Sequence, residues 1–152
     1  MSIITRLISY KKKFTTYSIG LLQAKSYRVL KHKTTHFLLP YKLSTIDWAL
    51  LGILYETTED MYLSEIADVL GVKAPFVTRL IKVLEKRGLI IIERSALDTR
   101  AKHMYLTSSG KQLVKTIESK LRVVSKSWLT DASPRDLIGY VRVLEAIVKS
   151  EE

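Results

Sequence analysis

The sequence lacks cysteine, so disulfides, thiolate metal sites and thiol redox sensing are excluded. Acidic residues are missing before Asp47, although Lys and Arg recur throughout that stretch. Long apolar runs are missing as well, because the longest, from Trp48 to Tyr55, is too short to cross a bilayer. The three lysines at 11–13 follow the apolar Ile3-Ile4 instead of preceding it, which does not suit a signal peptide. These absences predict a cytoplasmic protein without a membrane partner.

Positive charge is present in excess. The 152 residues carry a formal net charge of +10 at pH 7. A basic surface attracts polyanions, so nucleic acid or anionic lipid is the favoured class of partner. The hydrophobic fraction of 47% and the charged fraction of 26% are typical of one folded domain.

The N-terminal region is predicted to be helical and basic. Apolar periodicity indicates helix from Ile3 to about Leu39, broken near Thr15-Thr16 or at Gly20. Pro40 is expected to end this region, because the residue before a proline is biased out of the helical conformation. We therefore assign residues 1–42 to an N-terminal helical region.

Capping signals predict three further helices. Ser44 with Asp47 three residues later resembles a capping box, and the helix it opens should run to about Tyr55 as the buried centre of the domain. Thr107 is expected to cap a long helix, and Ser133-Pro134 to open the last one. Their apolar stripes consist of Leu113, Ile117, Leu121, Val124 and Trp128 in the first and Leu137, Tyr140, Val141, Leu144, Ile147 and Val148 in the second.

A helix-turn-helix followed by a hairpin is predicted between these helices. A short helix from about Ser64 stops at Gly71, and a second helix begins after Lys73 and ends at Gly88. The second helix has a stripe expected to face the core, made of Val77, Leu80, Ile81 and Leu84. Residues 89–93 and 102–106 are typical of strands, which makes the polar stretch between them the tip of a wing.

The predicted fold class is mainly α with a small β-hairpin wing. Residues 43–107 would form a winged helix-turn-helix core, and residues 1–42 and 108–152 would supply dimerisation helices. Each terminal helix carries an apolar stripe that the small core cannot cover, and fully burying one large aliphatic side chain stabilises by about 1.5–3 kcal/mol. A homodimer with twofold symmetry is therefore expected.

The candidate DNA surface is the side of the second helix opposite its apolar stripe, because such a helix fits the major groove. We expect Arg79 and Thr78 to read base edges and Arg100 to enter the minor groove, with Asp98 orienting a neighbouring arginine. The full set is Lys73, Ala74, Pro75, Phe76, Thr78, Arg79, Lys82, Arg94, Asp98, Arg100 and Lys102, of which Lys73, Lys82, Arg94 and Lys102 are assigned to phosphates. The alternative is a solvated helix face followed by an ordinary surface turn.

The run from Leu43 to Leu113 resembles the MarR family of winged helix-turn-helix regulators. The resemblance is carried by Leu63-Ser64-Glu65-Ile66-Ala67, Gly71-Val72, Val77-Thr78-Arg79-Leu80-Ile81, Leu84-Glu85-Lys86-Arg87-Gly88-Leu89-Ile90, Asp98-Thr99-Arg100 and Leu106-Thr107-Ser108-Ser109-Gly110. It implies a homodimer with intertwined terminal helices, binding to inverted-repeat duplex DNA, usually as a repressor, and a small-molecule effector of unknown identity. Lys73 departs from the family, in which a serine often caps the recognition helix.

Two features could indicate a metal or ligand site, but a structural role is preferred for both. His32 and His36 lie four apart on a helix, a spacing that can hold zinc, but no carboxylate lies in that region and we prefer surface or interface histidines. A ligand cavity could be lined by aromatic side chains, although core and interface filling is the commoner role. These side chains are Tyr17, Tyr27, Tyr41, Trp48 and Tyr55.

No enzyme motif is present. The sequence contains no nucleophile–base arrangement, phosphate-binding glycine loop or metalloprotease motif, so neither catalysis nor a cofactor is expected. The rival functions are a winged-helix module that binds protein or RNA, and a peripheral membrane protein that uses its basic N-terminal segment.

Overall fold

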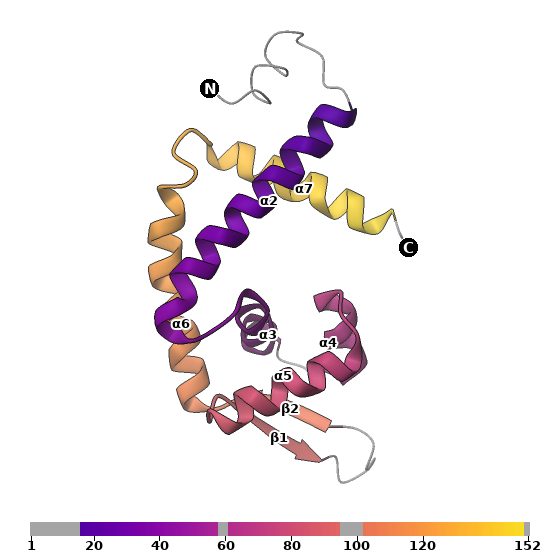
Figure 1. Ribbon diagram of the computed structural model, residues 1–152, viewed down its shortest axis with the longest axis vertical. Coiled ribbons are helices and arrows are strands. Elements are labelled where there is room, and N and C mark those ends of the chain that lie inside the picture. Colours follow the sequence, from indigo (N-terminus) through magenta and orange to yellow (C-terminus); the bar gives the residue numbers. More distant parts are fainter. Residues whose placement is uncertain (1–15, 58–60, 95–101, 151–152) are drawn as a thin grey trace. The chain divides into compact units, whose positions relative to one another are not determined.

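The computed structural model describes residues 16–57, 61–94 and 102–150 and confirms a mainly helical fold with one two-stranded hairpin (Figure 1). Two compact units are distinguished, Met1–Val114 and Lys115–Glu152. The elements are α2 (Thr16–Leu38), the 3-10 helix η1 (Leu39–Tyr41), α3 (Thr45–Glu56), α4 (Leu63–Leu70), α5 (Ala74–Lys86), β1 (Ile90–Arg94), β2 (Lys102–Leu106), α6 (Ser108–Lys126) and α7 (Pro134–Lys149).

Helix α2 begins at Thr16 and continues through Gly20, so of the two predicted break points the one at Gly20 is wrong. The other, near Thr15-Thr16, lies at the edge of the described residues. A glycine inside a helix costs only about 1 kcal/mol relative to alanine, which the rest of a 23-residue helix tolerates. The helix ends at Leu38, and the chain turns through η1, as Pro40 predicted. The helical segment expected before Thr16 lies outside the described residues.

Helix α3 begins at the predicted capping box. The Ser44 amide donates to Asp47 Oδ2 at 2.7 Å, and the Asp47 amide donates to Ser44 Oγ at 3.2 Å. Only Leu50 and Leu51 of this helix are buried, whereas its other apolar side chains remain partly exposed in the single chain. The expectation that α3 is buried nearly all round is therefore too strong.

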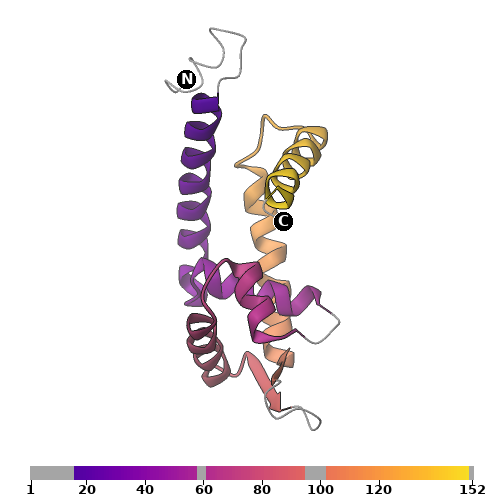
Figure 2. The ribbon, with the colours of Figure 1, turned by 90° about the vertical axis from the view of Figure 1, so that its right-hand side faces the viewer.

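The hairpin is closed where it meets α6. Strands β1 and β2 are antiparallel, with Ile90 opposite Leu106 and Arg94 opposite Lys102. Directly after β2, the Thr107 amide donates to the Leu89 carbonyl at 3.1 Å, and Thr107 Oγ1 accepts the Gly110 amide at 2.9 Å. Thr107 thus caps α6, as the sequence predicted, and ties its first turn to the hairpin. Figure 2 shows the start of α6 beside the hairpin.

The second unit contains the C-terminal part of α6 and all of α7. Helix α6 ends at Lys126, so Trp128, the last residue of the predicted stripe, lies beyond the helix and its assignment to α6 is wrong. Helix α7 begins at a second capping box, in which the Ser133 amide and hydroxyl both donate to Asp136 Oδ2, at 2.9 and 2.6 Å. Hydrogen bonds to the Asp136 carboxylate lower the pKa of this group below its usual value. The bond from the Ser133 hydroxyl has the larger effect and the bond from the Ser133 amide the smaller one. No residue of α7 itself is buried in the described chain.

The length and hydropathy of the described helices bear on whether the chain could cross a membrane. No single helix there is long and apolar enough to cross a bilayer. The segments Thr16–Tyr41 and Thr45–Glu56 satisfy length and hydropathy only when taken together, across a bend of 79°.

Replacing Gly110 by alanine tests the closure of the hairpin. A Cβ at this position would collide with the Leu89 carbonyl oxygen and lie 3.3 Å from Leu106 Cδ2. Because one contact is backbone, we expect a loss of about 1–3 kcal/mol in the free energy of unfolding, measured by urea denaturation. Gly52→Ala is the matched control, since nothing lies within 4 Å of its Cβ and the helix should gain stability. Equal stability of both variants would contradict the close approach at Gly110.

Candidate nucleic-acid interface

The turn between α4 and α5 has a closed backbone geometry. Gly71 is left-handed with φ 64°, and its amide donates to the Asp68 carbonyl at 3.0 Å. The Val72 amide donates to the Ala67 carbonyl at 2.9 Å, which completes a Schellman motif. Because glycine adopts this conformation without a Cβ penalty, the short connection fixes where α5 starts.

One side of α5 is buried, which determines the side that faces outward. Val77 and Leu84 are 0% exposed and Ile81 is 2% exposed, with Leu80 beside them. These four residues are the predicted stripe, and α5 contacts both α4 and β1. The opposite side of α5 therefore faces solvent.

The predicted contact residues of α5 lie on this outward side. Pro75, Phe76, Arg79 and Lys82 are exposed, as is Lys73 immediately before the helix, while Ala74 and Thr78 are partly buried. The structure thus places these seven candidates on one continuous segment, at the start and along the solvent side of α5.

Two interactions orient the polar side chains of this surface. The Arg79 guanidinium carbon lies 5.7 Å from the centre of the Phe76 ring, within the range of a cation–π contact. Thr78 Oγ1 donates to the Ala74 carbonyl at 3.1 Å, so the hydroxyl retains its lone pairs and methyl group for contacts outside the helix. Among the described residues, Arg79 is therefore supported by an aromatic ring.

The N-terminus of α5 has no side-chain cap. Lys73 occupies the N-cap position and makes no side-chain hydrogen bond to the first turn. The helix dipole favours anions at such an end, and the exposed ammonium group adds a positive charge there. This arrangement is chemically suited to a phosphate.

The hairpin candidates are described only in part. Arg94 and Lys102 face each other in the register at the open end of the hairpin, and this is all that is described of them. Asp98 and Arg100 lie outside the described residues. The assignment of Arg94 and Lys102 to phosphates therefore stays a prediction. So does the assignment of Arg100 to the minor groove, with Asp98 orienting a neighbouring arginine.

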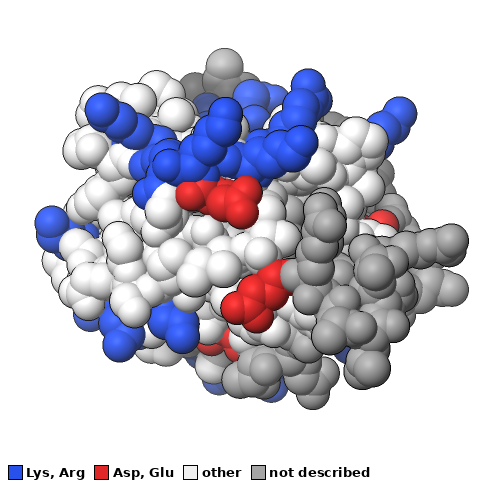
Figure 3. Space-filling model, turned by 90° about the horizontal axis from the view of Figure 1, so that it is seen from below, with Lys and Arg blue, Asp and Glu red and all other residues white. Residues whose placement is uncertain are grey.

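Charge is unevenly distributed on the face of the molecule seen from below in Figure 1. Lys and Arg side chains form a band along one edge, and Asp and Glu side chains lie in smaller groups beside it (Figure 3). A clustered positive potential of this kind attracts a phosphate backbone.

Arg87 has a role that the sequence analysis missed. Its guanidinium donates one hydrogen bond to the Lys42 carbonyl and one to the Tyr41 carbonyl, both at 2.8 Å. The partners lie 45 and 46 residues away in the sequence, so no local pattern could have indicated them. The Arg87 side chain is thus hydrogen-bonded to the backbone of the same chain.

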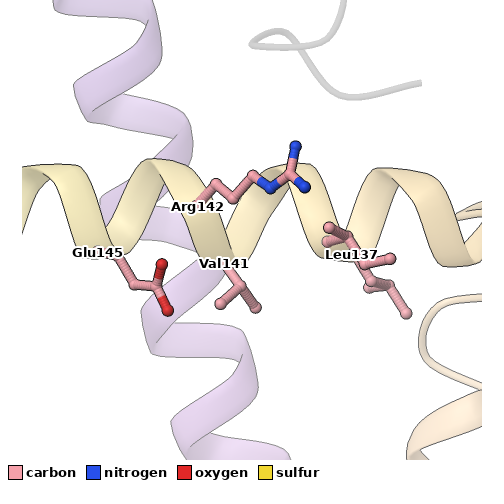
Figure 4. Close-up of a pocket in the computed structure, with 5 residues that line it drawn as sticks. Leu137, Val141, Arg142 and Glu145 are labelled. Atoms are coloured by element: carbon pink, nitrogen blue, oxygen red, sulfur yellow. The ribbon is translucent and has the colours of Figure 1, made fainter.

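The other candidate sites receive no added support. A shallow hollow of about 390 Å³ on α7 is lined by side chains of that helix only, with Val141 and Glu145 on one side and Arg142 along another (Figure 4). Tyr17 and Tyr27, two of the aromatic candidates, are exposed. Across the described ranges, no three His, Asp or Glu side chains are grouped to hold a metal ion.

Comparison with known proteins agrees with this geometry. The model of the MarR family matches residues 41–101, which include the helix-turn-helix and the first strand of the hairpin but not β2. Among solved structures, the Staphylococcus aureus MepR–DNA complex is 25% identical with a TM-score of 0.75, over 91% of this chain and 99% of that chain. The transcriptional regulator PA3341 is 29% identical with a TM-score of 0.76, over 87% and 96% of the two chains.

A third similarity concerns the fold alone. AbsC, a MarR family transcriptional regulator from Streptomyces coelicolor, has a TM-score of 0.77 at 20% identity, over 91% of this chain and 96% of that chain. The family match covers the segment that contains the closed turn and the outward side of α5, and the structural matches extend over the flanking helices. Residues 41–101 resemble the MarR family, and the comparisons support a winged-helix, DNA-binding transcriptional regulator of that kind.

Proposed function

We propose that this DNA-binding regulator represses transcription in the cytoplasm by occupying a palindromic duplex site as a homodimer. The observation that carries the proposal is the free outward side of α5, whose opposite side is anchored in the core. The similar MepR structure is a complex with DNA, which supports the same class of ligand for this chain. We assign it no catalytic activity.

In this mechanism α5 is the recognition helix. Arg79 can donate two parallel hydrogen bonds to the O6 and N7 atoms of a guanine, and Thr78 offers a hydroxyl oxygen and a methyl group. Pro75 and Phe76 supply apolar surface for a thymine methyl group. Ala74, next to them, allows the backbone to approach the bases.

Phosphate contacts would fix the register of the helix in the groove. Lys73 and Lys82 flank the base-reading side chains and suit the sugar-phosphate backbone. Arg94 and Lys102, paired at the open end of the hairpin, are assigned to the neighbouring backbone. Beyond them, we assign Arg100 to the minor groove, with Asp98 orienting Arg94 or Arg100.

Homodimer formation is supported by the apolar surface that the single chain leaves uncovered. The side chains of the predicted α7 stripe are up to 66% exposed, and α2 also exposes large apolar residues. We therefore assign residues 1–42 and 108–152 to the dimer and residues 43–107 to DNA binding. The exposed groups are Tyr17, Ile19, Leu21, Leu22, Tyr27, Val29 and Leu30 of α2 and Leu137, Tyr140, Val141, Ile147 and Val148 of α7.

Selection of bound duplexes from a random pool at physiological salt tests the proposal. We expect the full chain to recover a palindrome whose half-sites are about one helical turn apart, because two symmetric recognition helices reach adjacent major grooves. Recovery of no symmetric sequence would contradict it and favour a protein- or RNA-binding module. Thermal shift assays with small-molecule libraries, with and without the selected duplex, would test for an effector.

Arg79 variants test base recognition. We expect Arg79→Ala to weaken binding by about 1–3 kcal/mol per half-site, roughly fivefold to more than hundredfold for each, and to relax sequence preference. Arg79→Lys should retain a charge but lose the bidentate contact, so its preference should relax as well. Fluorescence anisotropy with cognate and scrambled duplexes measures both effects. Unchanged discrimination in both variants would remove Arg79 from base reading.

Lys73→Ser separates stability from DNA affinity. The hydroxyl supplies the missing N-cap bond, so the free energy of unfolding should rise by about 1 kcal/mol relative to Lys73→Ala. Both variants lose the same phosphate contact in each subunit of the dimer, so both should bind DNA more weakly, with the slope of log affinity against log salt reduced by about 1.8. Urea denaturation and salt titrations are the measurements. Wild-type affinity and slope in both variants would refute the phosphate assignment.

Val141→Glu tests the dimer surface of α7. Two copies of a 51% exposed valine would be replaced by buried charges, and losing about 3 kcal/mol of apolar burial weakens dimerisation roughly hundredfold. Ala146→Glu places the same charge on the opposite side of α7 and should leave the dimer intact. Sedimentation equilibrium measures the dissociation constants. Identical constants for the two variants would exclude this face from the interface.

A further inference from the structure

The Arg87 side chain bridges two parts of the first unit that the sequence separates. Its Nη1 donates to the Lys42 carbonyl oxygen and its Nη2 to the Tyr41 carbonyl oxygen, both at 2.8 Å. A guanidinium is planar and rigid, so two parallel bonds fix an orientation as well as a distance. Arg87 is therefore a two-point tie between the end of α5 and the corner that follows α2.

The corner at the acceptor end is well defined. Lys42 has a left-handed conformation, with φ 52° and ψ 41°, which is uncommon for a residue other than glycine. Its amide donates to the Leu39 carbonyl at 3.0 Å. Leu38 before the corner and Leu43 after it are 0% and 5% exposed, which anchors both of its sides. The two carbonyls thus belong to a backbone turn held by buried leucines.

The donor end of the tie is equally well defined. Arg87 is the C-cap residue of α5, and its amide donates to the Val83 carbonyl at 3.2 Å. Gly88 then turns left-handed at φ 69°, and the Leu89 amide returns to the Leu84 carbonyl at 3.0 Å. The guanidinium therefore leaves from the last residue of a closed helix end, and movement of α5 would move it directly.

We propose that Arg87 is a positioning residue for DNA recognition: it fixes the angle between the recognition helix α5 and the dimerisation helix α2. If the α2 helices are held by the partner subunit, this angle determines the spacing between the two recognition helices. The inference rests on the proposed function, because spacing has meaning only for a homodimer on a two-part site. A direct phosphate contact is disfavoured, because both nitrogens used are already engaged with protein carbonyls.

The absence of native cysteine allows a direct distance measurement within one chain. Gln23→Cys on α2 and Val83→Cys on α5 are exposed label sites, and diluting labelled protein with unlabelled protein isolates the intramolecular pair. We expect pulsed electron spin resonance to give a narrow distance distribution in the otherwise wild-type protein. Arg87→Ala should broaden or shift it, and so should Arg87→Lys, which keeps the charge but not the two-point contact.

Lys86→Ala is the matched control, because it removes the same charge from the neighbouring exposed position. Its distance distribution should remain that of the wild type. An unchanged distribution in Arg87→Lys, with the protein folded by circular dichroism, would overturn the proposal. If Arg87→Ala does not fold, Arg87→Lys alone decides the result.

DNA selection with half-sites at variable separation gives the functional result. The wild type should recover one spacing, whereas folded Arg87→Lys should admit neighbouring spacings as well. Its slope of log affinity against log salt should match the wild type, because no phosphate contact is lost. A slope lower by about 1.8 would indicate one such contact in each subunit and would overturn the proposal. Failure of the wild type to recover any two-part site would instead contradict the proposed function, whatever the distance measurement shows.

Discussion

The burial of one side of α5 is the constraint on which the account of DNA recognition depends. Val77 and Leu84 are completely inaccessible to solvent and Ile81 nearly so. Each fully buried aliphatic side chain contributes about 1.5–3 kcal/mol, so rotating the helix about its axis would cost several such contributions together. The closed turn at Gly71 fixes the start of the helix in the same way. The outward direction of Arg79 therefore follows from core packing and does not require DNA to be bound.

Apolar surface gives the second part of the account. The apolar stripe of α5 is buried within the winged core. In contrast, no residue of α7 is buried within the described chain. A contiguous apolar face of this kind is typical of a protein interface, and a copy of the same face is chemically complementary to it. Twofold symmetry would then turn one recognition helix into a pair. Core packing within a chain and pairing between chains thus have separate roles: the first directs a side chain outward, and the second sets how many half-sites are read.

Local signals in the sequence predicted most element ends. The capping boxes at Ser44 and Ser133 and the left-handed stop at Gly71 involve residues at most a few positions apart, so their chemistry can be read from spacing alone. The first strand was predicted one residue early, because the Leu89 amide closes α5 by donating to Leu84 before the ladder begins. Contacts between distant residues, such as the bonds of Arg87 and the fit of Gly110 against Leu89, could not be predicted without the fold. The hydrogen bond of Thr78 to the Ala74 carbonyl is different, because it joins residues four apart in one helix and is a local contact that the sequence analysis missed.

The central claim is that the outward side of α5 lies in the major groove of both half-sites. Because the chain has no cysteine, a single Val83→Cys substitution can carry an iron chelate that cleaves nearby DNA, and the cuts locate the helix directly. We expect two clusters of cleavage on a selected duplex, related by its dyad and centred about 10 base pairs apart. Cleavage scattered along the duplex, or confined to one side of the dyad, would contradict it.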